Sequence, residues 1–278
     1  MSFTKVKKGV CAAKGFVANG LNCGLNSDKN KNDLALVYSE TQCQAAAVYT
    51  TNKVKGAPIQ VTKAHLEASG HTAKAVIVNS KNANTCNADG VEKAQRMCEL
   101  AAAELSIDPN EVIVASTGVI GQVLPIEPIE SHIKELAKGL SADGNDKAVN
   151  AIMTTDTVPK QYAVKFMLGD CECTVGGMAK GSGMIHPNMA TTLNFITSDV
   201  AISSELIQKA LSEIVKVTYN CLSIDGDTST NDMVSIMANG LAGNTPITTE
   251  NDDYQTFKDA LYLSLIHISE PTRHSLIS

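Results

Sequence analysis

Short apolar runs, separated by polar and glycine-containing segments, make up much of the first half of the chain. Their length and their many β-branched residues are typical of β-strands. Farther along, residues 161–169 and 171–181 predict a hairpin that turns at Gly169 and Asp170, and residues 232–240 predict a further strand. The strands predicted in the first half are DLALVYS at 33–39, AAAVYTT at 45–51, KAVIVNS at 74–80 and EVIVAST at 111–117.

Helical periodicity marks the segments between and after these strands. Residues 126–140 predict an amphipathic helix, because their apolar residues recur every three or four positions. Residues 89–105, 203–224 and 252–264 predict three more helices. Strands and helices are mixed without strict alternation, which predicts a layered α/β or α+β protein. The apolar stripe of the helix over residues 126–140 consists of Ile126, Ile129, Ile133, Leu136 and Leu140.

The bulk composition narrows the possible functions. The chain has 278 residues, of which 44% are hydrophobic and 19% charged, enough for one large globular domain or two small ones. Its net charge is -6 and it has no long basic run, so we expect no nucleic-acid partner. It contains neither a membrane-length apolar segment nor the pattern of a secretory signal, so we expect no membrane and a cytoplasmic location.

Cysteines and histidines do not form a metal-binding pattern. No two cysteines are spaced as CxxC, and the six histidines lack the spacing of metal ligands. We therefore expect reduced thiols that mostly pack in the core, and no metal. The eight cysteines are at positions 11, 23, 43, 86, 98, 171, 173 and 221.

Residues 181–199, GSGMIHPNMATTLNFITSD, are the segment with the most chemical content. One alternative is an ordinary glycine-spaced loop that enters a strand. The other is that Thr191 is a nucleophile and that the protein cuts its own Ala190–Thr191 bond. In that case the freed α-amine of Thr191, with an ordinary pKa of about 7.7 to 8, can act as the general base for its own hydroxyl.

Three other loops beside predicted strands are also rich in Thr, Asn and Gly: residues 79–87, 115–125 and 153–157. Loops of this kind carry functional sites more often than cores do. The turn STGVIG at 116–121 offers backbone amides that suit an oxyanion hole. No Ser-His-Asp triad, metal cluster or phosphate-binding loop is evident.

Six motifs together resemble one family. The stretch KGSGMIHPNMATTLNFITSD is similar to the cleavage motif of the ornithine acetyltransferases, the bifunctional glutamate N-acetyltransferases of arginine biosynthesis. The resemblance covers about residues 8–263. Five further stretches match in the same order: GVCAAKGFVANGLNCGL, NSKNANTCNADG, STGVIG, MTTDTVPK and SIDGDTSTNDM.

The resemblance implies an α/β sandwich similar to that of N-terminal-nucleophile hydrolases, with distinct connectivity. It implies an N-acyltransferase that cleaves before Thr191 into an α chain, residues 1–190, and a β chain, which assemble as α2β2. The acetyl group of N-acetylornithine would pass through Thr191 to glutamate. No cofactor is implied, although some family members use acetyl-CoA as a donor.

Several positions match the family's site residues. Thr117 and Gly118 match the oxyanion-hole pair, and Thr154, Lys180 and Thr191 match substrate contacts. A lysine suits the α-carboxylate of an amino acid. Without the motifs, the alternative for Lys180 is a solvated surface residue, and the alternative for Thr154 is a helix-end cap.

Two matched segments stay without a role. Lys81 stands where family members usually carry Gly, at a position that can require a positive φ. The stretch DGDTSTND, residues 225–232, lacks the Glu and the spacing of a calcium loop, so it is either a structural turn or a wall of the site.

The C-terminal region departs from the family pattern, because the family's DGEGATK motif with its substrate-binding Glu is absent. We therefore expect residues 191–264 to be the start of a truncated β chain. The segment LIHISEPTRHSLIS is expected to break the preceding helix, and residues 265–278 to lie outside the natural gene product. Two alternative functions stay open: a related self-cleaving aminopeptidase or amidase, and an inactive truncated fragment.

Overall fold

The computed structural model describes residues 2–182, 192–221 and 227–274, with side chains described as far as residue 268. In these residues nine strands form one mixed sheet in the order β1-β6-β7-β8-β9-β3-β4-β5, with β2 paired to β3. The strands are β1 (Thr4–Val6), β2 (Phe16–Leu21), β3 (Leu34–Tyr49), β4 (Thr72–Asn79), β5 (Val112–Ser116), β6 (Lys160–Leu168), β7 (Cys171–Lys180), β8 (Leu193–Ser198) and β9 (Met233–Ala238).

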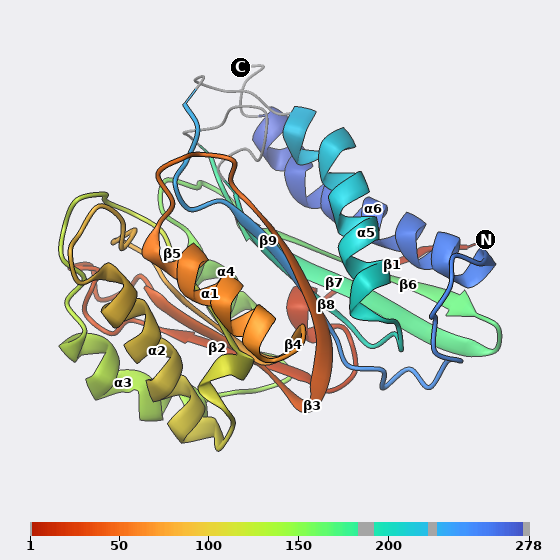
Figure 1. The fold of residues 1–278 in the computed structure, drawn as a ribbon, viewed down its shortest axis with the longest axis horizontal. Coiled ribbons are helices and arrows are strands. Elements are labelled where there is room, and N and C mark those ends of the chain that lie inside the picture. The colour runs from red at the N-terminus through yellow and green to blue at the C-terminus, as the bar shows by residue number, and fades with distance from the viewer. Residues whose placement is uncertain (1, 183–191, 222–226, 275–278) are drawn as a thin grey trace.

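Helices cover the sheet in two groups (Figure 1). Helix α6 packs against β6 and β7 and α5 against β3, whereas at the other end α1 and α2 pack against β5, and α3 packs against α2. Helix α4 packs against β2 and β3. The helices are α1 (Ala57–Ala68), α2 (Gly90–Leu105), α3 (Glu127–Lys138), α4 (Asn145–Ile152), α5 (Ser204–Val217) and α6 (Asp252–His274).

The strand period of two separates the core into layers. In β4, Val76 and Val78 belong to a cluster that includes residues of α4, whereas Ala75 and Ile77 belong to a cluster built with α2 and α3. The sheet is therefore covered on both faces, which confirms the predicted layered α/β fold. It also explains why the strands are apolar nearly throughout.

Strand β3 connects the two ends of the sheet. Residues 33–39 and 45–51 were expected to be separate strands, and this prediction is wrong. The exposed residues 40–42 look like a turn in the sequence, but they lie at a register irregularity between Tyr38 and Cys43 within one continuous strand. Its first half pairs with β2 and β4, and its second half pairs with β9.

Several predicted elements are confirmed. The hairpin of β6 and β7 is antiparallel and turns at residues 169–170. The helix over 126–140 appears as α3, with Ile129, Ile133 and Leu136 buried. The helix over 203–224 is shorter than predicted, because α5 ends at Val217.

Helix α6 contradicts the expected helix break after residue 264. The helix continues to His274, and Leu265 and Ile268 are buried at 0% and 1% exposure. Both residues continue the apolar face of Leu261, so the helical spacing is kept. That residues 265–278 lie outside the natural gene product stays a prediction.

The predicted chain boundary at residues 190 and 191 lies outside the described residues, but its flanks belong to one sheet. Strand β7 precedes the boundary and pairs with β8, which follows it. The α and β pieces of the predicted division would thus share a continuous set of backbone hydrogen bonds.

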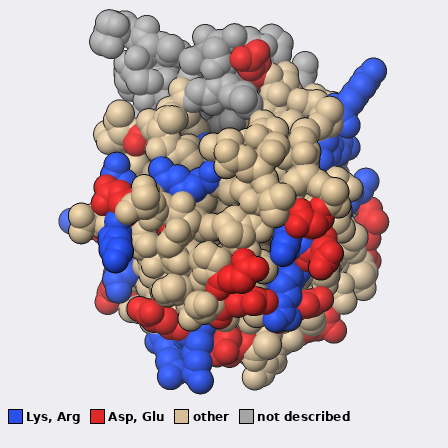
Figure 2. Space-filling view, turned by 90° about the vertical axis from the view of Figure 1, so that its left-hand side faces the viewer, with Lys and Arg blue, Asp and Glu red and all other residues tan. Residues whose placement is uncertain are grey.

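The surface carries both signs of charge. On the face shown in Figure 2, Lys and Arg alternate with Asp and Glu rather than forming one broad patch. Among the described residues, no helix has the length and apolarity that a membrane span requires. All eight cysteines are free thiols, and five of them are buried: Cys11, Cys23, Cys43, Cys98 and Cys173.

Candidate active site

A cavity of about 420 Å³ opens where the ends of β5 and β7 meet the loops that follow β4 and precede β9. It is lined by all four of the predicted site residues that the structure describes: Thr117, Gly118, Thr154 and Lys180. The predicted nucleophile Thr191 and its neighbour Ala190 lie outside the described residues. The structure thus brings together residues that are far apart in the sequence.

Lys180 is the last residue of β7 and is only 6% exposed. Its Nζ donates a hydrogen bond to Oγ1 of Thr117 at 3.1 Å. Burial lowers the pKa of the Lys180 ammonium, and the negative charges of Asp156 and Asp232 oppose this effect. The alternative of a solvated surface lysine is therefore wrong.

Gly118 follows Thr117 in a backbone conformation that favours glycine, with φ of 137°. A Cβ at this position would lie 2.1 Å from the carbonyl carbon of Lys81, so the loop after β4 leaves no room for a side chain. The N–H groups of Thr117 and Val119 donate to the carbonyls of Asn79 and Lys81. Within the described residues, the intervening Gly118 N–H has no acceptor, so it can serve a ligand.

Thr154 lies just beyond the end of α4. The C-cap position of this helix is occupied by Met153, so Thr154 is not its cap. The Thr154 N–H donates to Asp156 Oδ2 at 3.3 Å, and Asp156 Oδ1 accepts from the N–H of Gly181 at 2.8 Å. The Asp156 carboxylate thereby joins the Thr154 loop to the end of β7.

The pKa of Asp156 is affected by two opposing influences. Burial works to raise it, but hydrogen bonds from the Lys160 ammonium and the Gly181 N–H hold it below its ordinary value. The Lys160 Nζ lies 2.5 Å from Asp156 Oδ1, and both side chains are almost fully buried. Asp156 is therefore a carboxylate whose charge is already taken up by its own partners.

Asn231 holds three segments of the wall together. Its Nδ2 donates to the carbonyl oxygens of Ala83 at 2.7 Å and Ser116 at 3.0 Å. Its Oδ1 accepts from Thr85 Oγ1 at 2.6 Å. Since Ser229, Thr230 and Asn231 line the cavity, the described end of the DGDTSTND stretch is a wall of the site rather than a remote turn.

Asp232, the last residue of the DGDTSTND stretch, is a titratable residue to which the sequence analysis gave no role of its own. It is 1% exposed, and burial raises its pKa to about 8. A hydrogen bond from Ser229, the charge of Lys180 and the backbone N–H of Thr192 oppose this rise. Its Oδ2 has no hydrogen-bond partner among the described residues. Because Thr192 directly follows Thr191, Asp232 is a buried acid at the backbone next to the predicted nucleophile.

Lys81 confirms one detail of the sequence analysis. Its φ is 77°, in the left-handed region that side chains other than glycine rarely adopt. The residue lines the cavity and contributes the carbonyl that accepts from Val119. No group of His, Cys, Asp or Glu suited to holding a metal is present among the described residues.

Comparison with known proteins gives a consistent result. The chain is 49% identical over 256 residues to the arginine biosynthesis bifunctional protein ArgJ 1 of Clostridium acetobutylicum, which covers 92% of this chain and 62% of that protein. It thus spans less than two thirds of the length of this relative.

Two crystal structures share the fold. The arginine biosynthesis bifunctional protein argJ of Bacillus halodurans is 39% identical, with a TM-score of 0.63, covering 68% of this chain and 98% of that chain. Ornithine acetyltransferase complexed with ornithine from Mycobacterium tuberculosis is 35% identical, with a TM-score of 0.61, covering 69% and 100%. The ArgJ family model matches residues 17–271. The chain therefore belongs to the ArgJ family.

Proposed function

We propose that this chain is the self-cleaving, N-terminal part of an acetyltransferase that moves acetyl from N-acetylornithine to glutamate in arginine biosynthesis. The observation that carries the proposal is the Gly118 N–H, which has no acceptor among the described residues, beside the Lys180–Thr117 hydrogen bond in one cavity. Such a donor suits the oxyanion formed in acyl transfer. Supporting it, one relative is named an ornithine acetyltransferase and was crystallised with ornithine.

Self-cleavage is the first step of the proposed mechanism. The Thr191 hydroxyl oxygen attacks the carbonyl carbon of Ala190, the C–N bond breaks, and the nitrogen takes up the proton of the hydroxyl. Water then hydrolyses the resulting ester, leaving a carboxylate on Ala190 and a free α-amine on Thr191. The Gly118 N–H and the Thr117 side chain bind the oxyanion of each tetrahedral intermediate.

Acetyl transfer is the second step. The Thr191 hydroxyl, deprotonated by its own α-amine, attacks the acetyl carbonyl of N-acetylornithine. The C–N bond breaks and ornithine leaves with the proton on its amine. The amine of glutamate then attacks the acetyl ester, giving N-acetylglutamate and restoring the hydroxyl.

Two side chains support this chemistry by position. Lys180 provides a buried positive charge for the α-carboxylate of the amino-acid substrate. Thr154 lines the same cavity. The mechanism uses no cofactor, and acetyl-CoA is a possible second donor. An α2β2 assembly in the cytoplasm belongs to the same proposal.

The test is acetyl exchange between labelled N-acetylornithine and glutamate. We expect transfer by the protein, none by Thr191→Ala, and reduced transfer by Thr191→Ser, which keeps a hydroxyl. Release of amine from a dipeptide, without exchange, would instead support the aminopeptidase alternative. Exchange by Thr191→Ala at the parent rate would refute the mechanism.

A further inference from the structure

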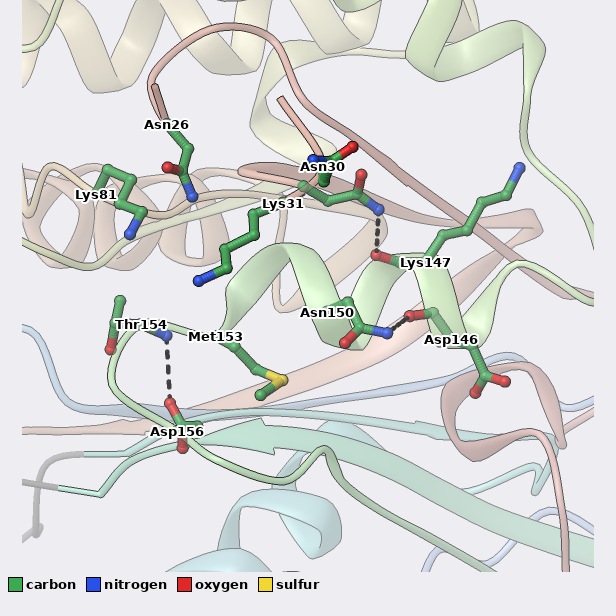
Figure 3. A pocket seen from close by; sticks show the side chains of 11 residues that line it. Asn26, Asn30, Lys31, Lys81, Asp146, Lys147, Asn150, Met153, Thr154 and Asp156 are labelled. Carbon is green, nitrogen blue, oxygen red and sulfur yellow. Dashed lines mark hydrogen bonds between the residues drawn. The ribbon is translucent and has the colours of Figure 1, made fainter. Parts of the chain in front are cut away.

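A second cavity, of about 390 Å³, lies directly beside the candidate active site. Lys81 and Thr154 line both cavities, so the two spaces adjoin along these residues. Its remaining wall comes from the loop before β3 and from α4 (Figure 3). A ligand in the first cavity can therefore extend into the second.

Nitrogen groups from two separate loops converge in this second cavity. Figure 3 shows the ammonium ends of Lys31 and Lys81 and the amide end of Asn26 turned toward a common space above Thr154. Among the described residues, Lys31 forms an ion pair with Asp28 at 3.9 Å, and both side chains are exposed, so this pair is weak. Lys81 forms no ion pair within the described residues.

Asn26 provides a hydrogen-bond donor without an acceptor. The residue is 8% exposed and its Oδ1 accepts from the Asp28 N–H at 3.1 Å. Its Nδ2, in contrast, has no acceptor among the described residues. A buried amide that faces a cavity with its donors free suits an anionic ligand.

The loop that carries these groups is held rigidly. The Asp33 carboxylate accepts from the backbone N–H groups of Cys23 at 2.7 Å and Asn26 at 2.6 Å. The Asn22 Nδ2 donates to the carbonyl of Lys31 at 2.7 Å. Such a preorganised loop loses little conformational entropy when it binds a ligand.

The two acids in the wall do not cancel the lysines. Asp156 is paired with Lys160 and with the Gly181 N–H. Asp146 accepts hydrogen bonds from Gln161 Nε2 and from a neighbouring amide, both at 3.1 Å. Asp156 is thus neutralised by Lys160, whereas Asp146 keeps its charge but points away from the ends of Lys31 and Lys81 in Figure 3. The ammonium groups of Lys31 and Lys81 stay available for a ligand. The left-handed backbone conformation of Lys81 is energetically costly, and such residues cluster at functional sites.

From these observations we infer that the second cavity is an anion-binding subsite, in which Lys31, Lys81 and Asn26 hold a carboxylate or phosphate of a ligand whose reacting end occupies the first cavity. The inference rests on the proposed function for the identity of that reacting end. The best-fitting class is an amino acid with a second, distal carboxylate. A phosphorylated acyl donor has the same anionic chemistry.

Isothermal titration calorimetry on the full chain tests the subsite with L-glutamate, its uncharged isostere L-glutamine, and pyrophosphate. We expect glutamate to bind at least tenfold more tightly than glutamine. Lys31→Met, which alters only the second cavity, should remove most of this preference, and Lys31→Met/Lys81→Met should remove the rest. Lys134→Met, an exposed lysine on α3, is the matched control and should keep it.

The outcomes separate the ligand sources. Preferential binding of glutamate identifies a carboxylate ligand, whereas lysine-dependent binding of pyrophosphate alone identifies a phosphate ligand. Equal binding of glutamate and glutamine with no pyrophosphate binding, or a preference unchanged in the double variant, would overturn the subsite. Thermal melts of each variant show that the fold is intact, and the denatured mass of the unaltered protein reports self-cleavage separately.

Discussion

Lys180 and Lys31 line two adjoining cavities, one each, and Thr154 lines both, yet the surroundings of the two lysines differ in kind. Lys180 is buried at a strand end, hydrogen-bonded to Thr117, and has a pKa lowered by burial. Lys31 is exposed on a loop. A group that takes part in chemistry gains from removal from water, because electrostatic interactions are stronger there. A group that attracts a charged end of a ligand needs only to be positioned and unpaired.

The largest expected effect concerns the candidate active-site cavity, which holds the buried Lys180. Gly118→Ala places a methyl group 2.1 Å from the carbonyl carbon of Lys81, so the loop must move and the Gly118 N–H with it. We expect transfer to fall at least about 100-fold, as for loss of an oxyanion donor, and the melting temperature to fall. Gly121→Ala is the matched control, since φ there is 78° but no atom lies within 4 Å. Equal effects of both substitutions would mean that backbone strain, and not the site, is responsible.

Lys180→Met should have the next largest effect. Loss of a buried, charged hydrogen-bond donor to a substrate carboxylate costs about 2 to 3 kcal/mol, or about 30- to 150-fold in kcat/KM for N-acetylornithine. Lys31→Met should reduce the same parameter for this donor far less. Steady-state kinetics with varied N-acetylornithine concentration measures kcat/KM for both variants. Similar losses for both variants would contradict the division between the two cavities.

Asp232→Asn should have a pH-dependent effect on the free energy of unfolding. The pKa of this carboxyl is raised to about 8 in the folded protein, above its ordinary value of 3.8. The folded state therefore loses stability as the pH rises from about 4 to 8, because the buried acid resists ionisation. Asn cannot ionise, so its stabilising effect should grow over this range and level off above pH 8.

Thermal melts from pH 5 to 9 provide the measurement for Asp232. The charged group that faces this carboxyl is Lys180, and Ser229 and the Thr192 N–H are its hydrogen-bond donors. An advantage for Asn that stays constant across the range would show that Asp232 does not titrate there. Asp232→Glu, which keeps the charge, is the control and should not reproduce the pH dependence of Asn.

The sequence predicted the elements whose pattern is local. The hairpin of β6 and β7 and the stripe of α3 follow from periods of two and of about 3.6. The continuity of β3 was missed because an exposed stretch inside a strand resembles a turn. The extent of α6 was missed because the unusual sequence of residues 265–278 was given more weight than the helical spacing of Leu261, Leu265 and Ile268.

The candidate site could be predicted only from the family motifs. Periodicity does not bring Thr117, Thr154 and Lys180 together; the resemblance predicted that they share a site, and the structure places them around one cavity. The DGDTSTND stretch was considered as a wall of the site, but nothing in the sequence distinguished Asp232 from its other two Asp residues. Its raised pKa arises from burial, which depends on how β9 packs between β8 and β3.

The most direct test of the account is the mass of the purified protein under denaturing conditions. Self-cleavage predicts two species whose masses correspond to a break between Ala190 and Thr191. A single species of 29.3 kDa, from a protein that also melts cooperatively, would contradict the claim that Thr191 is a self-activated nucleophile.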